Sequence, residues 1–247
     1  MRWLLGWVWW TILPIRKAMA IRNYRFAFPK HSPTELRHTV GDMVWSYVEL
    51  AMGRRATLEG LELMRGGGIC LAGHGGAWDL ALISAAAHLP ITIFVKPPSN
   101  RLAAWFITRA RTRAGIELLP PSGSSQAAYD ALRQGRVLVF VQDQRHNRGI
   151  PVDFFGKPAW TSRGFGRIAN RTGARLFGAW QWRDDQGHHL RFETLNPTPP
   201  TDTDEAIDYL TEYSQHFYEE KIRQHPHSWL WLHNRWRSLR GKHEQSQ

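Results

Sequence analysis

The sequence of 247 residues contains a single cysteine, Cys70, and this scarcity excludes several kinds of protein. One thiol cannot form an intrachain disulfide, and there is no pair of cysteines with the spacing of a zinc site. Both absences are typical of a protein from a reducing compartment. Cys70 lies within an apolar stretch, where a thiol behaves as a small buried hydrophobe.

Several sequence signatures of catalysis are also missing. No Gly-x-Ser-x-Gly elbow and no Gly-x-x-x-x-Gly-Lys loop occurs, so neither a serine hydrolase nor a phosphate-binding loop is indicated. The glycines of 164–169 resemble a dinucleotide fingerprint, but no strand leads directly into them. His225, His227 and His233 lack a carboxylate or thiolate partner at ligand spacing, and we expect them on a wet, aromatic surface helix. We therefore expect neither a metal nor a cofactor.

Acidic residues are in short supply. Lysine and arginine number 32 against 21 aspartates and glutamates, which gives a formal charge of +11 and a pI near 10.4. The partners are expected to be anionic: nucleic acid, acidic lipid or an acidic carrier protein. Thirteen tryptophans favour lipid, because indole rings prefer the membrane interface. Nucleic acid ranks last, since the basic residues are spread along the chain without a nucleic-acid motif.

No apolar run is long enough to cross a membrane. The first thirteen residues are apolar and rich in tryptophan, but Pro14 ends them well short of the roughly 20 residues a spanning helix needs. They lack a small-residue cleavage site. We expect a helix lying in the interface, with basic residues of 16–30 on anionic headgroups. The alternative is an amphipathic helix packed on its own domain. On the first interpretation, residues 1–30 associate with the membrane and 31–247 form the catalytic domain.

Strands and helices alternate along the rest of the chain. Short apolar strands are expected at 56–60, 69–72, 91–95, 116–119, 137–141, 152–155, 174–182 and 190–195. Helices are expected at 77–88, 99–114 and 124–133, from Thr161, and at 204–221. This alternation predicts a single α/β domain with a central, mostly parallel sheet flanked by helices.

The apolar strand at 69–72 leads directly into His74, flanked by glycines and followed by an apolar helix. The carboxyl end of a strand is where open α/β sheets place their chemistry. Asp79, in the first turns of the helix, is expected to hold one ring nitrogen, which leaves the other to act as a general base on a hydroxyl. The amides near Gly75 and Gly76, or the Lys96 side chain, are expected to stabilise the oxyanion.

The His-x-x-x-x-Asp pattern after an apolar strand resembles the catalytic motif of the lysophospholipid acyltransferase superfamily. Val95–Asn100 with the following arginines, Gly135–Gln144, Val152–Thr161 and the aromatic tail resemble the bacterial lipid A late acyltransferases, over nearly all the chain from about residue 33. This branch usually has arginine at Lys96 and glutamate at Asp79. The resemblance assigns catalysis to His74 and Asp79, and substrate binding to Gly75, Gly76, Lys96, Asn100, Arg113, Asp143, Gln144, Phe155, Gly156 and Thr161.

The resemblance implies a glycerolipid acyltransferase-like fold and direct acyl transfer from a thioester to a hydroxyl, without an acyl-enzyme. It implies acyl-acyl carrier protein as donor, with coenzyme A open, and the hydroxyacyl chain of a lipid A precursor as acceptor. An acidic carrier is expected to dock on Arg101, Arg109 or the tail arginines. The protein is expected at the cytoplasmic face of the inner membrane, bound peripherally or monotopically.

Two other interpretations stay open. In the first, the protein is an acyltransferase of the same superfamily whose acceptor is another lipid, such as a lysophospholipid or an amino-acid-derived lipid. The Phe-Pro-Glu-Gly block of the glycerol-phosphate branch is missing, however. Alternatively, the chain is a basic membrane-surface binding protein that keeps the fold without the catalysis.

Overall fold

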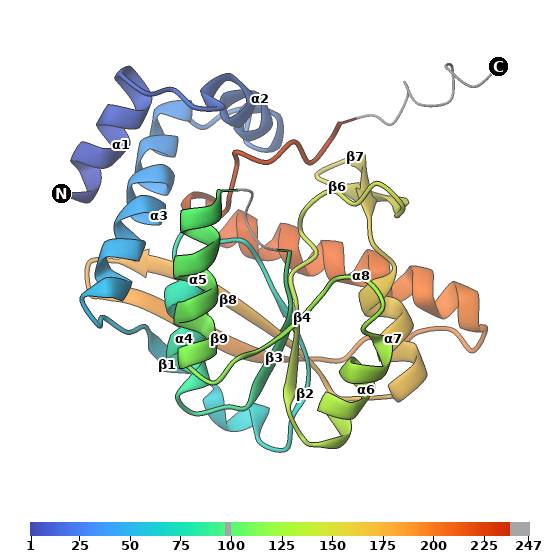
Figure 1. Cartoon of the computed structure of the whole chain (residues 1–247). Coiled ribbons are helices and arrows are strands. Elements are labelled where there is room, and N and C mark those ends of the chain that lie inside the picture. Colours follow the sequence, from blue (N-terminus) through green and yellow to red (C-terminus); the bar gives the residue numbers. More distant parts are fainter. Residues whose placement is uncertain (97–99, 238–247) are drawn as a thin grey trace.

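A computed structural model describes residues 1–96 and 100–237, so Pro97, Pro98 and Ser99 of the expected substrate segment lie outside the described residues. A seven-stranded sheet with the order β1-β9-β8-β2-β5-β3-β4 forms the centre (Figure 1). Its strands are β1 (Thr57–Glu59), β2 (Gly68–Ala72), β3 (Ile91–Phe94), β4 (Glu117–Leu119), β5 (Val137–Phe140), β8 (Leu176–Asp184) and β9 (Gly187–Leu195). The only antiparallel pair in this sheet is β8 with β9, which confirms the predicted α/β class and mostly parallel sheet.

Helices cover both faces of the sheet, because successive side chains of a strand point to opposite sides. Ile69 and Leu71 of β2 pack in one apolar cluster with α6, α7 and α8, whereas Cys70 packs in a second cluster with α4. The flanking helices are α4 (Trp78–Ala86), α5 (Arg101–Arg113), α6 (Ser125–Arg133), α7 (Gly164–Thr172) and α8 (Thr203–Gln224). The site therefore lies on a three-layer scaffold.

One local prediction in the second half was wrong, and one predicted strand lies outside the main sheet. The strand expected at 152–155 is β6 (Ile150–Phe154), which leaves the main sheet and pairs only with β7 (Lys157–Thr161). Thr161 therefore ends a strand, and the next helix, α7, begins only at Gly164. An apolar run of this length suits a hairpin as well as a central strand, so tertiary contacts decide between them.

The N-terminal helices α1 (Arg2–Thr11) and α2 (Lys17–Ala27) precede a short 3-10 turn and α3 (Leu36–Ala51). Helix α1 packs tightly on α3, since a Cβ atom added at Gly6 would lie 2.1 Å from the carbonyl oxygen of Arg37. Its other face, with Trp3 and Trp7, is exposed. Within residues 1–96 and 100–237, no helix is both long and apolar enough to span a membrane.

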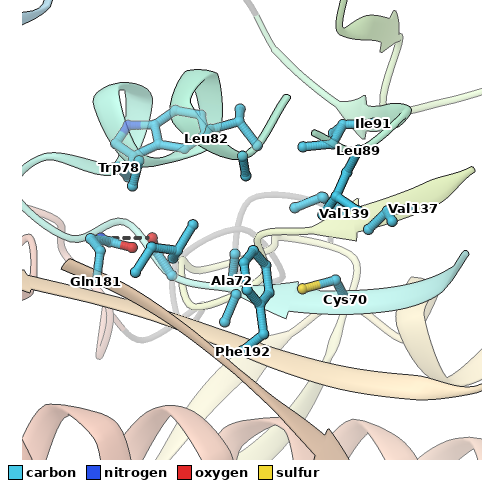
Figure 2. Close-up of a pocket in the computed structure, with 15 residues that line it drawn as sticks. Cys70, Ala72, Trp78, Leu82, Leu89, Ile91, Val137, Val139, Gln181 and Phe192 are labelled. Atoms are coloured by element: carbon cyan, nitrogen blue, oxygen red, sulfur yellow. Dashed lines mark hydrogen bonds between the residues drawn. The ribbon is translucent and has the colours of Figure 1, made fainter. Parts of the chain in front are cut away.

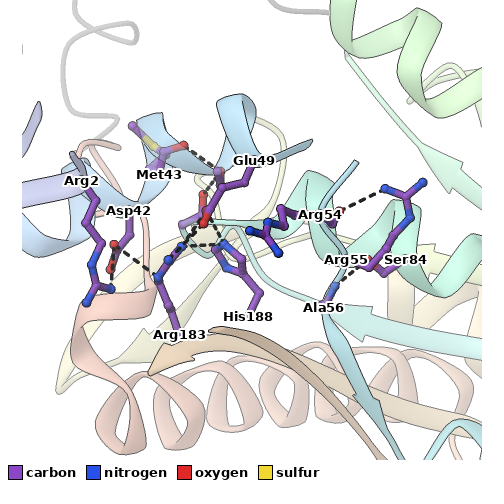
Figure 3. Close-up of polar contacts among 12 residues, drawn as sticks. Arg2, Asp42, Met43, Glu49, Arg54, Arg55, Ala56, Ser84, Arg183 and His188 are labelled. Carbon is purple, nitrogen blue, oxygen red and sulfur yellow. Dashed lines mark hydrogen bonds and ion pairs between the residues drawn. The ribbon is translucent and has the colours of Figure 1, made fainter. Parts of the chain in front are cut away.

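Polar contacts join this N-terminal part to the sheet (Figure 3). Arg183 of β8 makes two hydrogen bonds, of 2.6 and 3.0 Å, to the Glu49 carboxylate of α3. His188 of β9 binds the same carboxylate at 2.7 Å, and Arg2 of α1 binds Asp42 at 3.3 Å. The contacts of Glu49 fix α3 against β8 and β9, and the Arg2–Asp42 pair joins α1 to α3.

The chain after α8 is not the surface helix that its histidines suggested. After a short 3-10 turn at Pro226–Ser228 it runs between the sheet and α2, and Trp229, Trp231 and Arg235 are almost completely buried. Asn23 of α2 holds this segment by donating to the carbonyl oxygens of Trp231 and His233, at 3.0 and 2.7 Å. The bulky indoles make the segment part of the core.

Candidate active site

His74 and Asp143 meet where the adjacent parallel strands β2 and β5 end. The Nδ1 atom of His74 lies 2.7 Å from Oδ1 of Asp143, and the His74 backbone N–H donates to Oδ2 at 2.8 Å. The Asp143 side chain is fully buried, whereas that of His74 is 23% exposed. An ionised carboxylate only accepts, so the Nδ1 atom carries the proton and Nε2 has a free lone pair. The arrangement suits a general base.

Trp229 completes the surroundings of the Asp143 carboxylate. Its indole Nε1–H donates to Oδ2 at 2.7 Å. Burial opposes ionisation of Asp143, but the charge and hydrogen bonds of His74 and the indole N–H outweigh it, so the pKa of Asp143 is below its ordinary value. Asp143 is therefore a carboxylate held in its charged form by three donors.

The expectation that Asp79 would hold the His74 ring is corrected by the structure. Its Oδ1 accepts from Arg111 Nε at 2.8 Å, and Oδ2 accepts from the Tyr47 hydroxyl at 3.1 Å. Asp79 is buried, and burial together with the neighbouring Asp79 charge raises the pKa of Tyr47. The carboxylate at hydrogen-bond distance from His74 comes from β5 rather than from the helix that follows the histidine.

Asp79 still borders the site, through Trp78. The Arg111 guanidinium that binds Asp79 lies 4.4 Å from the centre of the Trp78 ring. That ring in turn lies 5.4 Å from the His74 ring. The ion pair between α4 and α5 therefore fixes an aromatic side chain beside the imidazole.

The backbone of the loop 73–77, which contains His74, is bound to the C-terminal segment. The Gly76 amide donates to the carbonyl oxygen of Ser228, and the Gly75 amide donates to that of Gly73, both at 2.9 Å. These two amides are thus already paired, which leaves the neighbouring amides and Lys96 as the expected donors to an oxyanion. Gly75 is required for another reason: an added Cβ would lie 1.7 Å from the Gln181 amide nitrogen.

An apolar cavity lies behind this loop, between α4 and the sheet (Figure 2). The space in it that is open to water-sized molecules is about 30 Å³, enough for roughly two waters. Gly73 and Trp78 line its end next to His74, and Leu89, Ile91 and Val137 line the other end. In the strand register Gly68 pairs with Val137, so the two ends are about five residues, or roughly 16 Å, apart along β2.

The structure separates the remaining expected residues of the first half. Lys96 is exposed just after β3, and Gln144 is half-buried next to Asp143. Asn100 accepts from the Ala103 amide at 3.0 Å and caps α5. Arg113 is exposed in the last turn of α5, about 20 Å along the helix axis from Asn100.

Phe155, Gly156 and Thr161 belong to the β6–β7 hairpin. Phe155 and Gly156 form its turn with φ angles of 57° and 75°. Thr161 is fully buried, and its hydroxyl accepts from Arg235 at 2.6 Å. The structure thus gives Thr161 a supporting role, because Arg235 belongs to the segment that carries Trp229.

Sequence reasoning missed Trp229, and it expected Arg111 to bind an anion or to line the substrate cleft rather than to pair with Asp79. Trp229 lies 86 positions from Asp143, and no local spacing connects them. The signal that existed was the density of tryptophans in the tail, which is more typical of a core segment than of a wet surface. The described residues contain no group of three or more His, Cys, Asp or Glu side chains that could hold a metal ion.

We expect Trp229→Phe to move the acid limb of the pH profile of kcat/KM to higher pH. The substitution removes one of the donors that favour ionised Asp143, so the pKa of Asp143 rises. Asp143 then loses its charge, and its hold on the His74 Nδ1–H, at a higher pH. The profile is measured from rates of the acyl transfer that the resemblance implies, at a series of pH values.

Trp231→Phe is the matched control. Trp231 is equally buried and its ring lies 4.6 Å from that of Trp229, but its Nε1 donates to the carbonyl oxygen of Pro226. It should lose similar packing and keep the wild-type pH profile. Equal displacement in both variants would show that the effect is structural and that Trp229 does not act on Asp143.

Comparison with known proteins identifies the family of the chain. A model of the bacterial lipid A biosynthesis acyltransferase family matches residues 4–238. The chain is 22% identical to the lipid A biosynthesis palmitoleoyltransferase of Escherichia coli K12, over 90% of this chain and 79% of that protein. It is 29% identical to a phosphatidylinositol mannoside acyltransferase of Mycobacterium tuberculosis, over 69% of this chain and 54% of that protein.

The comparison with solved structures finds the 1-acyl-sn-glycerophosphate acyltransferase of Thermotoga maritima. The TM-score is 0.39 at 13% identity, over 89% of this chain and 94% of the other. The family match extends from α1 to the buried C-terminal segment, and so includes His74, Asp143 and Trp229. The chain belongs to the bacterial lipid A biosynthesis acyltransferase family, and it is an O-acyltransferase.

Proposed function

We propose that the protein transfers a fatty acyl chain from a thioester to a hydroxyl of a membrane glycolipid, with His74 as general base. The observation that carries the proposal is the pair formed by partly exposed His74 and buried, ionised Asp143, beside an apolar cavity. Asp143 and the indole of Trp229 fix the tautomer, and the free Nε2 is available to a substrate hydroxyl.

The reaction is a direct displacement. His74 Nε2 takes the proton of the acceptor hydroxyl while the hydroxyl oxygen attacks the thioester carbonyl carbon. The resulting tetrahedral intermediate collapses with breakage of the carbon–sulfur bond, and the leaving thiolate takes the proton from the imidazolium. Lys96, exposed at the end of β3, is our candidate for stabilising the oxyanion.

An acyl-enzyme on the single cysteine is disfavoured. Cys70 is buried in the second apolar cluster, and burial raises the pKa of its thiol to about 12. A thiol held protonated is a poor nucleophile. Direct transfer therefore fits the chain better than a covalent intermediate.

The apolar cavity behind the loop is proposed to widen and hold the acyl chain, because its present space of about 30 Å³ is too small for one. Its lining is almost entirely apolar, and it begins beside Trp78, next to the base. A chain lying there places its thioester carbonyl near His74 and its methyl end toward Ile91 and Val137. The depth of the cavity then limits the length of the chain that is transferred.

Ala85→Leu should shift the preference of the enzyme toward shorter acyl chains. Ala85 lines the deep half of the cavity, and a leucine there fills space that the end of a long chain would occupy. One or more methylenes are worth a change on the order of ten-fold or more in relative kcat/KM. The measurement is competition between long-chain and short-chain donors.

Ala87→Leu, on the exposed end of the same helix, is the control for general disturbance of α4. It should leave chain-length preference unchanged. If Ala85→Leu also leaves the preference unchanged while the protein stays folded, the acyl chain binds elsewhere.

The donor is proposed to be acyl-acyl carrier protein and the acceptor a lipid A-type glycolipid. The net charge of +11 favours encounter with an acidic carrier. Arg101 and Arg109, expected to dock it, are exposed, but the tail residue Arg235 is buried and unavailable. Similarity to a phosphatidylinositol mannoside acyltransferase makes other sugar-bearing acceptors part of the same test.

We also propose that the protein works as a peripheral or monotopic protein on the cytoplasmic face of the inner membrane. The exposed apolar residues of α1 and the linker after it support membrane contact, and one face of α1 packs on the domain. The interfacial helix and the helix packed on its own domain, expected as alternatives for the first thirteen residues, thus each describe one face of α1. Residues 1–30 are proposed to act as the membrane-associating part of the chain.

The deciding experiment is acyl transfer by the purified full-length protein in detergent. A mixture of acyl-acyl carrier proteins is supplied with lipid A precursors, mannosylated inositol lipids, lysophospholipids and amino-acid lipids, and the products are identified by mass spectrometry. Acylation of one acceptor, lost in a His74 variant, supports the proposal and names the substrate. No product with any acceptor would favour a binding protein that keeps only the fold.

A further inference from the structure

The first half of α5 exposes three large apolar side chains. Leu102 and Trp105 are 80% and 63% exposed, and Phe106 is exposed as well. Their spacing places them on one stripe of the helix. Contiguous apolar residues on a surface mark contact with a partner or a membrane.

Basic residues continue the same stripe toward the end of the helix. Arg109 and Arg113 are exposed, and α5 contains no acidic residue. The Arg109 guanidinium lies 5.7 Å from the Trp105 ring. Arg109 and Arg113 follow Leu102 by seven and eleven positions, or about 10 and 16 Å along the helix axis. Arginines at this height meet lipid headgroups when the apolar turns are sunk about 5–10 Å into the headgroup and acyl boundary.

Helix α5 belongs to one row with the other exposed apolar helices. Helix α1 packs on α3, α3 on α4, and α4 on α5. In Figure 1 the first turns of α5 reach beyond the ends of the strands, on the same side of the molecule as α1 and α2. Exposed apolar residues on this row are Trp3, Leu4 and Trp7 of α1, Val44 and Val48 of α3, and Leu102, Trp105 and Phe106 of α5.

We propose that α5 is a second membrane anchor, which inserts Leu102, Trp105 and Phe106 into an anionic bilayer with Arg109 and Arg113 on the headgroups. A bilayer explains both ends of the stripe, because it offers an apolar layer below an anionic one. An acidic carrier protein explains only the arginines. This proposal rests on the proposed function in one respect only, namely that the acceptor is a membrane lipid.

The opposite face of α5 links the proposed anchor to the loop 73–77, which contains His74. Arg111 is buried there, binds Asp79 at 2.8 Å and covers Trp78, the neighbour of His74. The inserted helix therefore holds the base at a constant height above the bilayer.

The test uses the single native cysteine to advantage. Cys70 is buried and the pKa of its thiol is raised, so it should not react with a thiol-directed fluorophore. In the Leu102→Cys variant, an environment-sensitive fluorophore of this kind is therefore attached at position 102. Vesicles of phosphatidylethanolamine with phosphatidylglycerol should shift the emission of this label to the blue. The same label in Arg133→Cys on α6, where the native side chain is 67% exposed, should not respond. Vesicle binding without a shift at position 102 would overturn the proposal.

A charge pair gives a second, independent readout. Arg109→Gln combined with Arg113→Gln should weaken binding to anionic vesicles about 25-fold, at about ten-fold per 1.4 kcal/mol and roughly 1 kcal/mol per arginine. Arg133→Gln combined with Arg167→Gln, on α6 and α7, removes the same charge from outside the row and should bind like wild type. If both double variants bind anionic vesicles equally weakly, the effect depends only on net charge and the proposal is overturned.

Soluble substrates separate this proposal from the proposed function. Leu102→Gln with Trp105→Gln should turn over a short-chain acceptor without vesicles at the wild-type rate, and lose rate only on vesicle-borne acceptor. Loss of rate on the soluble acceptor, or a blue shift of the label caused by carrier protein alone, would assign the stripe to the donor and overturn the anchor. Absence of turnover in wild type contradicts the proposed function and leaves the vesicle measurements valid.

Discussion

His74→Asn is expected to lower kcat/KM for acyl transfer by about 10² to 10⁴-fold, the usual contribution of a general base. The asparagine amide retains a donor toward Asp143 in place of Nδ1, but it has no atom equivalent to Nε2. The backbone contacts of residue 74 with Asp143 and Leu230 do not involve the side chain and should persist. Rates come from product formation with donor and acceptor varied separately.

The thermal midpoint is the control for this variant. Because the His74 side chain is partly exposed and the buried carboxylate keeps its partners, the midpoint should remain close to that of wild type. A folded His74→Asn protein with wild-type turnover would exclude His74 as the base. The reaction would then depend on a different reactive group of the protein.

Asp143→Asn is expected to cost up to about 10⁴-fold in kcat, similar to the loss when a catalytic histidine is left in the wrong tautomer. Three donors face the carboxylate: the His74 amide, the His74 ring and the Trp229 indole. An asparagine offers one acceptor oxygen and an amino group. The amino group then faces Nδ1 and favours the tautomer with the proton on Nε2, which cannot accept a proton from the substrate.

Asp79→Asn is the matched comparison, because the two carboxylates are equally buried but serve different partners. It leaves the Arg111 guanidinium without its counter-ion, and breaking a buried pair in this way costs about 3–5 kcal/mol of unfolding free energy. Its kcat per folded molecule should fall far less than that of Asp143→Asn. Adding Arg111→Met should recover most of the stability, since the unpaired charge is removed.

These two variants also separate the structure from the sequence-based hypothesis. Large loss of kcat in Asp79→Asn with retained stability, together with an active Asp143→Asn protein, would restore Asp79 as the partner of His74. The reverse pattern supports the Asp143 pair. Denaturant unfolding and single-turnover rates on the same preparations give the two quantities.

Much of the fold was predictable because it depends on local patterns. The apolar runs at β2, β3 and β5 identify buried parallel strands, and the positions between them have helical periodicity. His74 could be placed at the end of β2 for the same reason. The tail was misjudged because its histidines and arginines suggested solvent, whereas three large side chains there are buried.

The partners within the site depend on contacts between distant segments. Asp79 lies five positions from His74 and was the obvious candidate, yet helix α4 directs its side chain toward Arg111 and Tyr47. Asp143 lies 69 positions away and reaches His74 because β5 pairs with β2 in parallel, which brings their carboxyl ends together. Local periodicity therefore places a strand and the residue at its end, whereas the pairing of strands and the docking of the tail choose that residue's neighbours.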